Sequence, residues 1–147
     1  MGTSFRSSQR LKDKLEEFEG CRLEAYKCAG NVWTIGIGHT KDVRRGDRIS
    51  RQMALEYLSD DLKMFEKGVN SLGVCETLGQ FDALVSFAFN LGLAALREST
   101  LLKLIREGAA EEVIRAEFSR WVYCRGVKLG GLVKRRAWEA NRFFEKW

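Results

Sequence analysis

The sequence predicts an α+β fold, with a small β-hairpin or twisted sheet near the N-terminus and a helical lobe behind it. Two observations support this prediction. β-Branched and aromatic residues gather within residues 21–40, where the Gly30-Asn31 pair indicates a turn between two strands. Helical periodicity covers most of the remaining chain, and residues 78–91 are apolar on nearly every face. This last segment is typical of a long central buried helix.

Five further helices are expected from apolar residues that recur every three or four positions. In the first of them, Leu11, Leu15 and Phe18 form one apolar stripe. Because the chain contains no proline, glycines such as Gly20 and polar caps such as Ser50 must end or begin the helices. The predicted segments are Ser7–Phe18, Ser50–Val69, Ser99–Arg106, Ala109–Tyr123 and Gly131–Lys146.

The length and composition are typical of one globular domain. We expect residues 1–147 to form it, with the hairpin at about 19–40 and the helical lobe at about 50–147. Apolar residues make up 45% and charged residues 31%, and no segment approaches the roughly 20 apolar residues needed to span a bilayer. No secretory signal is visible. We therefore expect a monomer, without stable membrane insertion, in the cytoplasm of the cell that produces it.

The chain is basic, with 25 Lys and Arg against 20 Asp and Glu and a net charge of +5. Such a charge favours a nucleic acid, anionic lipid or an acidic polymer such as bacterial cell wall as partner, and it is also compatible with ordinary solubility. A nucleic-acid-binding domain would show a continuous basic stripe on one helix. Here the basic residues alternate with acids along residues 63–117, so no nucleic-acid partner is expected.

Metal and cofactor chemistry has little support in this sequence. The chain has four cysteines and a single histidine, and no two cysteines are spaced as Cys-x-x-Cys. We expect no metal, no cofactor and free thiols, although a disulfide pair is compatible with the even number of cysteines.

Glu19 is the candidate catalytic acid. It lies where the first predicted helix ends, among the apolar residues Phe18, Leu23 and Tyr26. Burial disfavours the charged form of a carboxyl group and so raises its pKa, and a protonated acid is what a glycosidic leaving oxygen requires. The alternative is a solvated acid at a helix end, which is the commoner case when such a residue is considered alone.

Cys28 and Thr34 are candidates for a second catalytic group. A hairpin that turns at residues 30–31 can bring both side chains to one end. A thiolate can act as base or nucleophile, and a threonine hydroxyl can orient a water molecule. The alternative for Cys28 is a small buried hydrophobic residue. A cysteine peptidase that uses Cys28 and His39 is disfavoured, because no glycine-flanked nucleophile begins a helix.

Two motifs lie in the predicted hairpin region. They are Glu-Gly-x-Arg-Leu-x-Ala-Tyr from Glu19 and Thr-Ile-Gly-x-Gly-His-Thr from Thr34. With them the chain resembles the phage-type lysozymes, the endolysins of glycoside hydrolase family 24. Further motifs follow in the family's order, and together they cover nearly the whole chain. They are Gln80–Gly92, Ser99–Leu102 and Gly131-Leu132-x-x-Arg135-Arg136-x-x-Glu139.

The resemblance implies an inverting muramidase that hydrolyses the β-1,4 bond between N-acetylmuramic acid and N-acetylglucosamine. It maps the catalytic glutamate to Glu19 and the catalytic threonine to Thr34. The family's usual aspartate maps to Cys28, which is a departure from the pattern. Cys28 then replaces the carboxylate as a thiolate base, acts as a nucleophile, or marks a weakened enzyme. We favour the base, because Glu19, Thr34 and the surrounding glycines are intact.

The resemblance also indicates residues that support the site. Gly36 and Gly38 permit positive backbone dihedrals and close approach of a sugar chain. His39 is expected to be structural and to pair with Asp61.

Substrate contacts are expected from the helical lobe. Phe89 and Asn90 match the cleft-lining end of the central helix, where a ring can stack on a sugar and an amide can bond an acetamido group. Packing in the core is the alternative for Phe89. Arg135 and Arg136 are expected near Glu19 or the muropeptide, and a solvated helix face is the alternative for both.

The predicted function is therefore lysis of bacterial cells by cleavage of peptidoglycan, with the wall reached after release from the producing cell. The alternative is a weak or inactive cell-wall-binding protein on a lysozyme fold.

Overall fold

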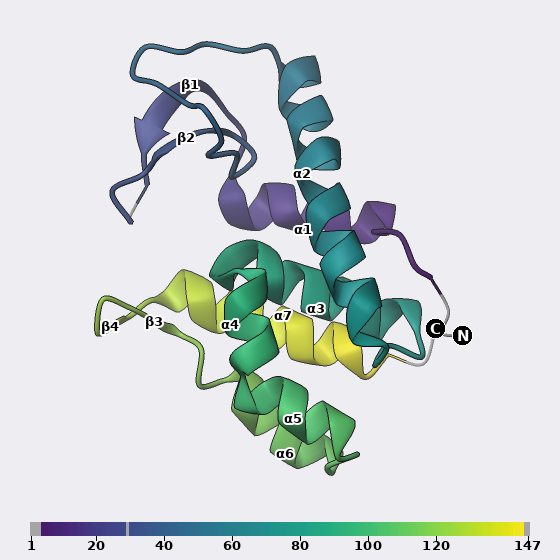
Figure 1. Ribbon diagram of the computed structural model, residues 1–147. Coiled ribbons are helices and arrows are strands. Elements are labelled where there is room, and N and C mark those ends of the chain that lie inside the picture. The colour runs from purple at the N-terminus through teal and green to yellow at the C-terminus, as the bar shows by residue number, and fades with distance from the viewer. Residues whose placement is uncertain (1–3, 29, 146–147) are drawn as a thin grey trace. The chain divides into compact units, whose positions relative to one another are not determined.

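The computed structural model describes residues 4–28 and 30–145, which divide into two compact units (Figure 1). One unit is Gln9–Met64, and the other joins the residues up to Ser8 with those from Phe65 onward. The boundary falls within helix α2 (Arg51–Leu72). The hairpin unit thus includes a helix on each side of the hairpin, whereas the sequence placed everything from about residue 50 in the helical lobe.

The unit Gln9–Met64 is built around a two-stranded antiparallel sheet. Helix α1 (Gln9–Glu19) ends at Gly20, which has φ +75° and donates its N–H to the carbonyl of Glu16 at 2.7 Å. Strand β1 (Arg22–Lys27) then pairs with β2 (Trp33–Gly36). The turn between them contains Asn31 with φ 63°, as the Gly-Asn pair predicts.

The chain segment after β2 adds a further backbone ladder to β1. The N–H of Ala25 donates to Asp47 and the N–H of Ile49 donates to Leu23, both at 2.9 Å. Ser50 then caps α2, as predicted, by accepting the N–H of Met53 at 3.1 Å. The core of this unit combines apolar side chains of α1, β2, α2 and the turn after β2, all at most 2% exposed: Leu11, Leu15, Ile35, Ile37, Ala54, Leu58 and Leu62.

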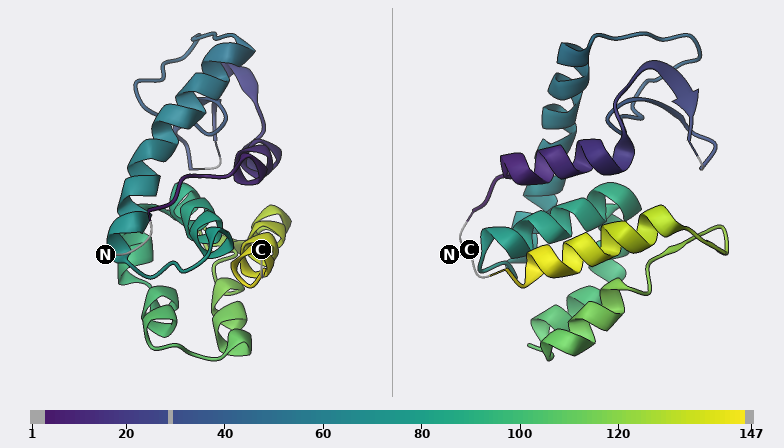
Figure 2. Two further views of the ribbon diagram at one scale, coloured as in Figure 1. Left: turned by 90° about the vertical axis from the view of Figure 1, so that its right-hand side faces the viewer. Right: turned by 180° about the vertical axis from the view of Figure 1, so that it is seen from behind.

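The helical unit is organised around α3 (Leu78–Leu91), which confirms the predicted central buried helix. Residues 81–88 of α3 are all fully buried. Figure 2 shows α7 (Gly130–Phe143) running beside α3. The shorter helices of the unit are α4 (Leu93–Glu98), α5 (Thr100–Arg106) and α6 (Glu111–Phe118). No helix in the described ranges combines the length and apolarity that membrane crossing demands.

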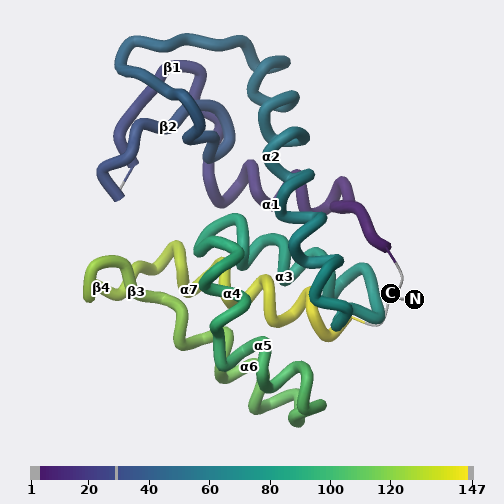
Figure 3. The backbone as a smooth tube through the Cα atoms, in the orientation of Figure 1, coloured from purple at the N-terminus to yellow at the C-terminus, as the bar shows by residue number. Residues whose placement is uncertain are grey.

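The prediction of one helix from Ala109 to Tyr123 is wrong at its C-terminal end. Helix α6 stops at Phe118, and two short strands follow, β3 (Tyr123–Cys124) and β4 (Val127–Lys128), which form a second hairpin (Figure 3). Its turn residues Arg125 and Gly126 have φ 51° and 80°, values that a right-handed helix does not allow. Helix α4 was not predicted, and Lys146, the predicted end of the last helix, lies outside the described residues.

Candidate functional site

Glu19 is the last residue of α1 and is half-buried. The Tyr26 hydroxyl on strand β1 has a raised pKa. Burial is the main cause of this rise, and the negative charge of Glu19 is the second. Arg22 opposes this rise, and Cys28 adds to it. The end of α1 and the hairpin therefore place Glu19 and Cys28 each within electrostatic range of Tyr26.

Tyr26 is a residue to which the sequence analysis gave no catalytic role. Its Cα pairs with that of Thr34 across the sheet, and the guanidinium of Arg22 lies 4.4 Å from its ring centroid. The ring thus lies against a cation of its own strand, and its residue is the cross-strand partner of Thr34. The sequence feature that could have identified Tyr26 is its position inside the first motif, between Glu19 and Cys28.

Cys28 follows β1 at the start of the turn and is half-buried. Burial opposes ionisation of its thiol, but hydrogen bonds from the backbone of Val32, the side chain of Thr34 and the backbone of Gly30 lower its pKa overall. The sulfur lies close to Gly30, since a Cβ on this glycine would be only 3.7 Å away. A turn that directs several donors toward one sulfur favours the thiolate, the form that a base or nucleophile requires.

Thr34 belongs to β2 and is 3% exposed. Its hydroxyl donates to the carbonyl of Val32 at 3.0 Å and also hydrogen-bonds to the Cys28 thiol. Because a hydroxyl carries one proton, it can donate fully to only one of these acceptors at a time. The near-complete burial of Thr34 leaves little surface through which it could contact a water molecule.

Gly36 and Gly38 have φ 63° and 67°, which confirms the predicted positive dihedrals. The space around Gly36 serves protein packing, because a Cβ there would lie 3.3 Å from side-chain atoms of Ala54 and Ile49. A sugar was expected to approach the backbone closely at the two glycines. At Gly36 it is helix α2 that approaches instead.

His39 and Asp61 form the contact that the resemblance implied. Nδ1 of His39 lies 2.8 Å from Oδ2 of Asp61, and the two side chains are 13% and 23% exposed. The imidazole also packs against the ring of Tyr57, with centroids 4.5 Å apart. Together these contacts tie the end of the hairpin to α2.

A hollow of about 570 Å³ lies beside this pair, between the segment 41–49 and α2. His39, Asp61 and Tyr57 line it, but Glu19, Cys28 and Thr34 do not. The hollow is therefore separate from the candidate catalytic residues.

Phe89 and Asn90 lie near the end of α3, in the helical unit. The ring of Phe89 packs on Phe65, with centroids 5.3 Å apart, while Oδ1 of Asn90 accepts a hydrogen bond from Nη2 of Arg136 at 2.8 Å. Both side chains are half-buried. Packing, the alternative considered for Phe89, is thus at least part of its role.

Arg135 is 3% exposed, and its Nη2 donates to the carbonyl of Ser86 at 3.0 Å. Its Nε also lies 3.5 Å from the fully buried carboxylate of Glu139. This burial favours a packing role over contact with a substrate. It also differs from the solvated helix face considered as the alternative.

Glu139 is the centre of a buried polar network that the sequence analysis did not identify. Burial raises its pKa, against the opposing influence of Arg136, Arg135 and Ser86. Ser86 donates its hydroxyl to Glu139 at 2.6 Å, and Nε of Arg136 lies 2.8 Å from the same carboxylate. The network joins α3 to α7.

Residues 4–28 and 30–145 contain no group of three or more His, Cys, Asp or Glu side chains that could hold a metal ion. The four cysteines are free thiols, and they differ in environment. Burial raises the pKa of Cys75 to about 12, whereas the pKa of Cys28 is lowered. Cys28 thus differs from Cys75 in having hydrogen-bond donors around its thiol.

The chain is 44% identical over 140 residues to the endolysin of Bacillus phage PZA, a match that covers 92% of this chain and 54% of that protein. The chain thus spans about half the length of this curated relative.

Two solved structures have the same fold. The muramidase domain of SpmX from Asticaccaulis excentricus is 33% identical, with a TM-score of 0.85 over 95% of this chain and 98% of that one. The endolysin from Escherichia coli O157:H7 phage FAHEc1 is 30% identical, also with a TM-score of 0.85, over 100% of this chain and 98% of the other. The family model described as phage lysozyme matches residues 16–139. The chain belongs to the phage lysozyme family.

Proposed function

We propose that this protein is a muramidase that hydrolyses the β-1,4 bond between N-acetylmuramic acid and N-acetylglucosamine in bacterial peptidoglycan. The observation that carries the proposal is that Glu19 and Cys28 both act on Tyr26, and that Thr34 hydrogen-bonds to Cys28, in a chain of the phage lysozyme family. As a phage endolysin would, it acts on the wall after release from the cell that produced it.

Glu19 is assigned the role of general acid. It protonates the glycosidic oxygen as the bond to the anomeric carbon breaks, and the sugar develops oxocarbenium character. Its half-buried position at the end of α1 supports this role.

Cys28 is assigned the role of general base, in place of the family's usual aspartate. Its thiolate removes a proton from the attacking water, and the new bond forms on the face opposite the leaving group. The hydrogen bonds that lower its pKa support this assignment. Thr34 is assigned the orientation of that water, through the hydroxyl that also hydrogen-bonds to Cys28.

His39 and Asp61 are assigned a supporting role through their contact. Gly38, Phe89 and Asn90 stay proposed substrate contacts. For Arg135, burial makes an indirect role, through the helix packing around Glu139, the better assignment.

The experiment is mass analysis of the fragments released from purified peptidoglycan by the protein and by its Glu19→Gln variant. We expect disaccharide-peptides with reducing N-acetylmuramic acid ends, and a loss of about 10²- to 10⁴-fold in rate for the variant. Glu17→Gln on the exposed side of α1 is the matched control and should retain activity. Unchanged turnover in Glu19→Gln would show that Glu19 is not the general acid.

A cell-wall-binding protein without activity is the alternative function. The same experiment distinguishes it, because such a protein would sediment with peptidoglycan and release no fragments.

A further inference from the structure

The stretch from Ser119 to Trp138 has an unusual charge pattern. It contains six basic residues and no acidic one, so its charge of +6 exceeds the +5 of the whole chain. Arg120 pairs with Glu117, and two other arginines are buried in α7. The remaining three make no ion pair with any described residue and are exposed: Arg125, Lys128 and Lys134.

The β3–β4 hairpin carries two of these cations and extends away from the helices of its unit (Figures 1 and 3). Its base is anchored. The indole of Trp121 packs edge-on against Phe87 with centroids 5.2 Å apart, Val122 is 5% exposed, and its carbonyl accepts the N–H of Leu129 at 3.0 Å. The hairpin is therefore a fixed projection with a free tip.

Arg125 occupies the first position of the two-residue turn at this tip. With φ 51° there and 80° at Gly126, the turn is of type I′, which favours Asn, Asp or Gly at the first position. A long cationic side chain in the left-handed region carries a conformational cost, because its Cβ crowds the backbone there. The turn thus holds a charge where local backbone preference would select a different residue.

Large apolar side chains are exposed in the same stretch. Tyr123 and Val127 are both 60% exposed, and Leu129 and Val133, just before and within the first turn of α7, are 36% and 40% exposed. Tyr123 pairs directly with Lys128 across the hairpin, so that an aromatic ring and an ammonium group share one face. A folded domain gains nothing by leaving such side chains in water, which indicates a partner for them.

We propose that the β3–β4 hairpin and the first turn of α7 dock on the surface of an anionic phospholipid bilayer. The cations of Arg125, Lys128 and Lys134 would lie among the lipid phosphates, while Tyr123 and Val127 enter the boundary between headgroups and acyl chains. Aromatic rings and basic side chains that flank aliphatic residues are the combination that interfacial binding uses. This function is additional to hydrolysis of peptidoglycan and does not depend on it.

An anionic wall polymer is the other partner that the charge would fit. Such a polymer would bind through ion pairs with the cations alone. It has no apolar phase in which valine and leucine side chains could be buried. The aliphatic side chains beside the cations therefore favour the bilayer.

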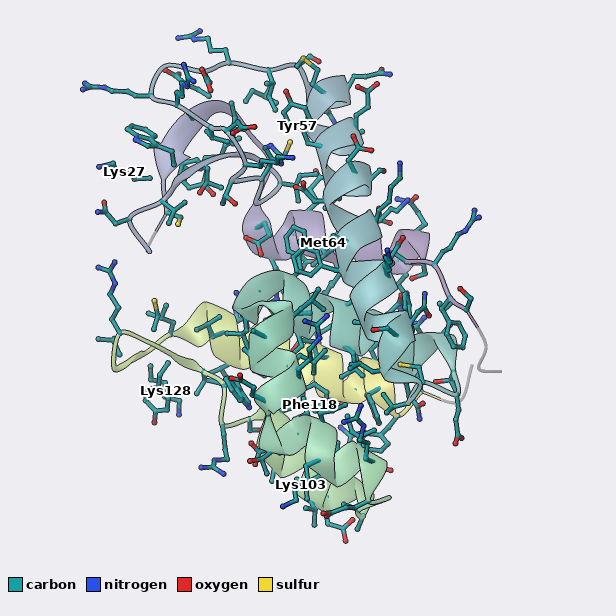
Figure 4. All side chains as sticks on the ribbon, viewed as in Figure 1. Lys27, Tyr57, Met64, Lys103, Phe118 and Lys128 are labelled. Atoms are coloured by element: carbon teal, nitrogen blue, oxygen red, sulfur yellow. The ribbon has the colours of Figure 1, made fainter. Side chains whose placement is uncertain are left out.

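The test is sedimentation of the full chain with vesicles of 30% phosphatidylglycerol and 70% phosphatidylcholine, and with vesicles of phosphatidylcholine alone. We expect binding only to the anionic vesicles, and about a hundredfold weaker binding when Arg125, Lys128 and Lys134 are all changed to Gln, since each charge contributes about fivefold. The matched control changes Lys67, Lys103 and Arg106 to Gln. These are exposed residues outside the hairpin, and Lys103 lies on α5 (Figure 4).

The apolar contribution is tested by Val127→Ser, with Val113→Ser on α6 as its matched control. We expect about fivefold weaker vesicle binding for the first and no change for the second. Arg125→Gly removes one charge in a turn that suits glycine, so its expected fivefold loss cannot be attributed to misfolding.

Three results would overturn the proposal. One is the absence of binding to anionic vesicles. Another is an equal loss of vesicle binding in the two triple variants, which would show that net charge alone determines the binding. The third is binding to purified wall teichoic acid that is stronger than binding to vesicles and is unchanged in Val127→Ser.

Discussion

The side chain of Thr34 hydrogen-bonds to Cys28, six residues earlier in the chain, and lowers the pKa of its thiol. The same hydroxyl donates to the carbonyl of Val32 at 3.0 Å. As Cys28 ionises, the negative sulfur becomes the stronger acceptor, and the single hydroxyl proton is drawn from the carbonyl toward it. The β1–β2 turn therefore contains a hydrogen bond whose partner depends on the charge of Cys28.

The pH dependence of hydrolysis tests the role of Cys28 as base. Its thiolate is the active form, so the rate should rise as pH increases through the pKa of Cys28, which hydrogen bonds lower from its ordinary value. Cys28→Asp should move this acid limb several pH units lower, because the pKa of aspartate is about 3.9. The measurement is the release of reducing ends from peptidoglycan between pH 4 and pH 9.

Cys28→Ser is the companion variant, since a serine hydroxyl does not ionise in this range. We expect a loss of about 10²-fold or more. Wild-type activity in Cys28→Ser would show that the thiol is dispensable, and an unshifted acid limb in Cys28→Asp would assign that limb to another group.

Thiol alkylation should distinguish Cys28 from Cys75. The thiolate is the reactive form, and the pKa of Cys28 is lowered while burial raises that of Cys75 to about 12. At pH 7 we therefore expect iodoacetamide to modify Cys28 at least tenfold faster than Cys75, as measured by peptide mapping at successive times. In urea the two rates should converge. Equal rates in the folded protein would contradict the hydrogen-bonded setting described for Cys28.

The His39–Asp61 contact should contribute to stability rather than to chemistry. Asp61→Asn removes a charged partner from a contact of 2.8 Å, and we expect the free energy of unfolding in urea to fall by about 1 kcal/mol. Asp60→Asn is the matched control, because Asp60 is exposed and pairs only with Lys63 among the residues described, so its effect should stay below about 0.5 kcal/mol.

The paired variant His39→Gln should lose a similar amount of stability and keep turnover within a few-fold of wild type. A hundredfold loss of turnover without loss of stability would instead make His39 a catalytic residue.

The buried pair of Asp82 and Arg142 should contribute more to stability than any exposed pair. Oδ2 of Asp82 lies 2.8 Å from Nη2 of Arg142 and 2.5 Å from the hydroxyl of Ser8, and Asp82 is fully buried. Arg142→Met leaves this carboxylate without its cation, and we expect a loss of about 3–5 kcal/mol. Urea unfolding measures it, and Lys14→Met in the exposed pair with Glu17 should cost about 0.5 kcal/mol or less. Comparable losses in both variants would contradict the importance of burial.

Local sequence patterns were sufficient for most of the secondary structure. The apolar run that predicts residues 78–91 matches α3, and Ser50 and Gly20 begin and end helices where their chemistry indicates. Near Tyr123 the same approach failed. The apolar residues Trp121 and Val122 fit a helix by periodicity, but they pack at the base of a hairpin instead.

The sequence by itself determined the family, the hairpin with Glu19, Cys28 and Thr34, and the central helix, because these depend on spacing along the chain. Only the tertiary structure decided the environment of each group. Donors from separate positions in the turn lower the pKa of Cys28, and burial against Glu139 removes Arg135 from solvent. Burial and hydrogen bonding depend on which segments meet in space, and spacing along the chain does not specify that.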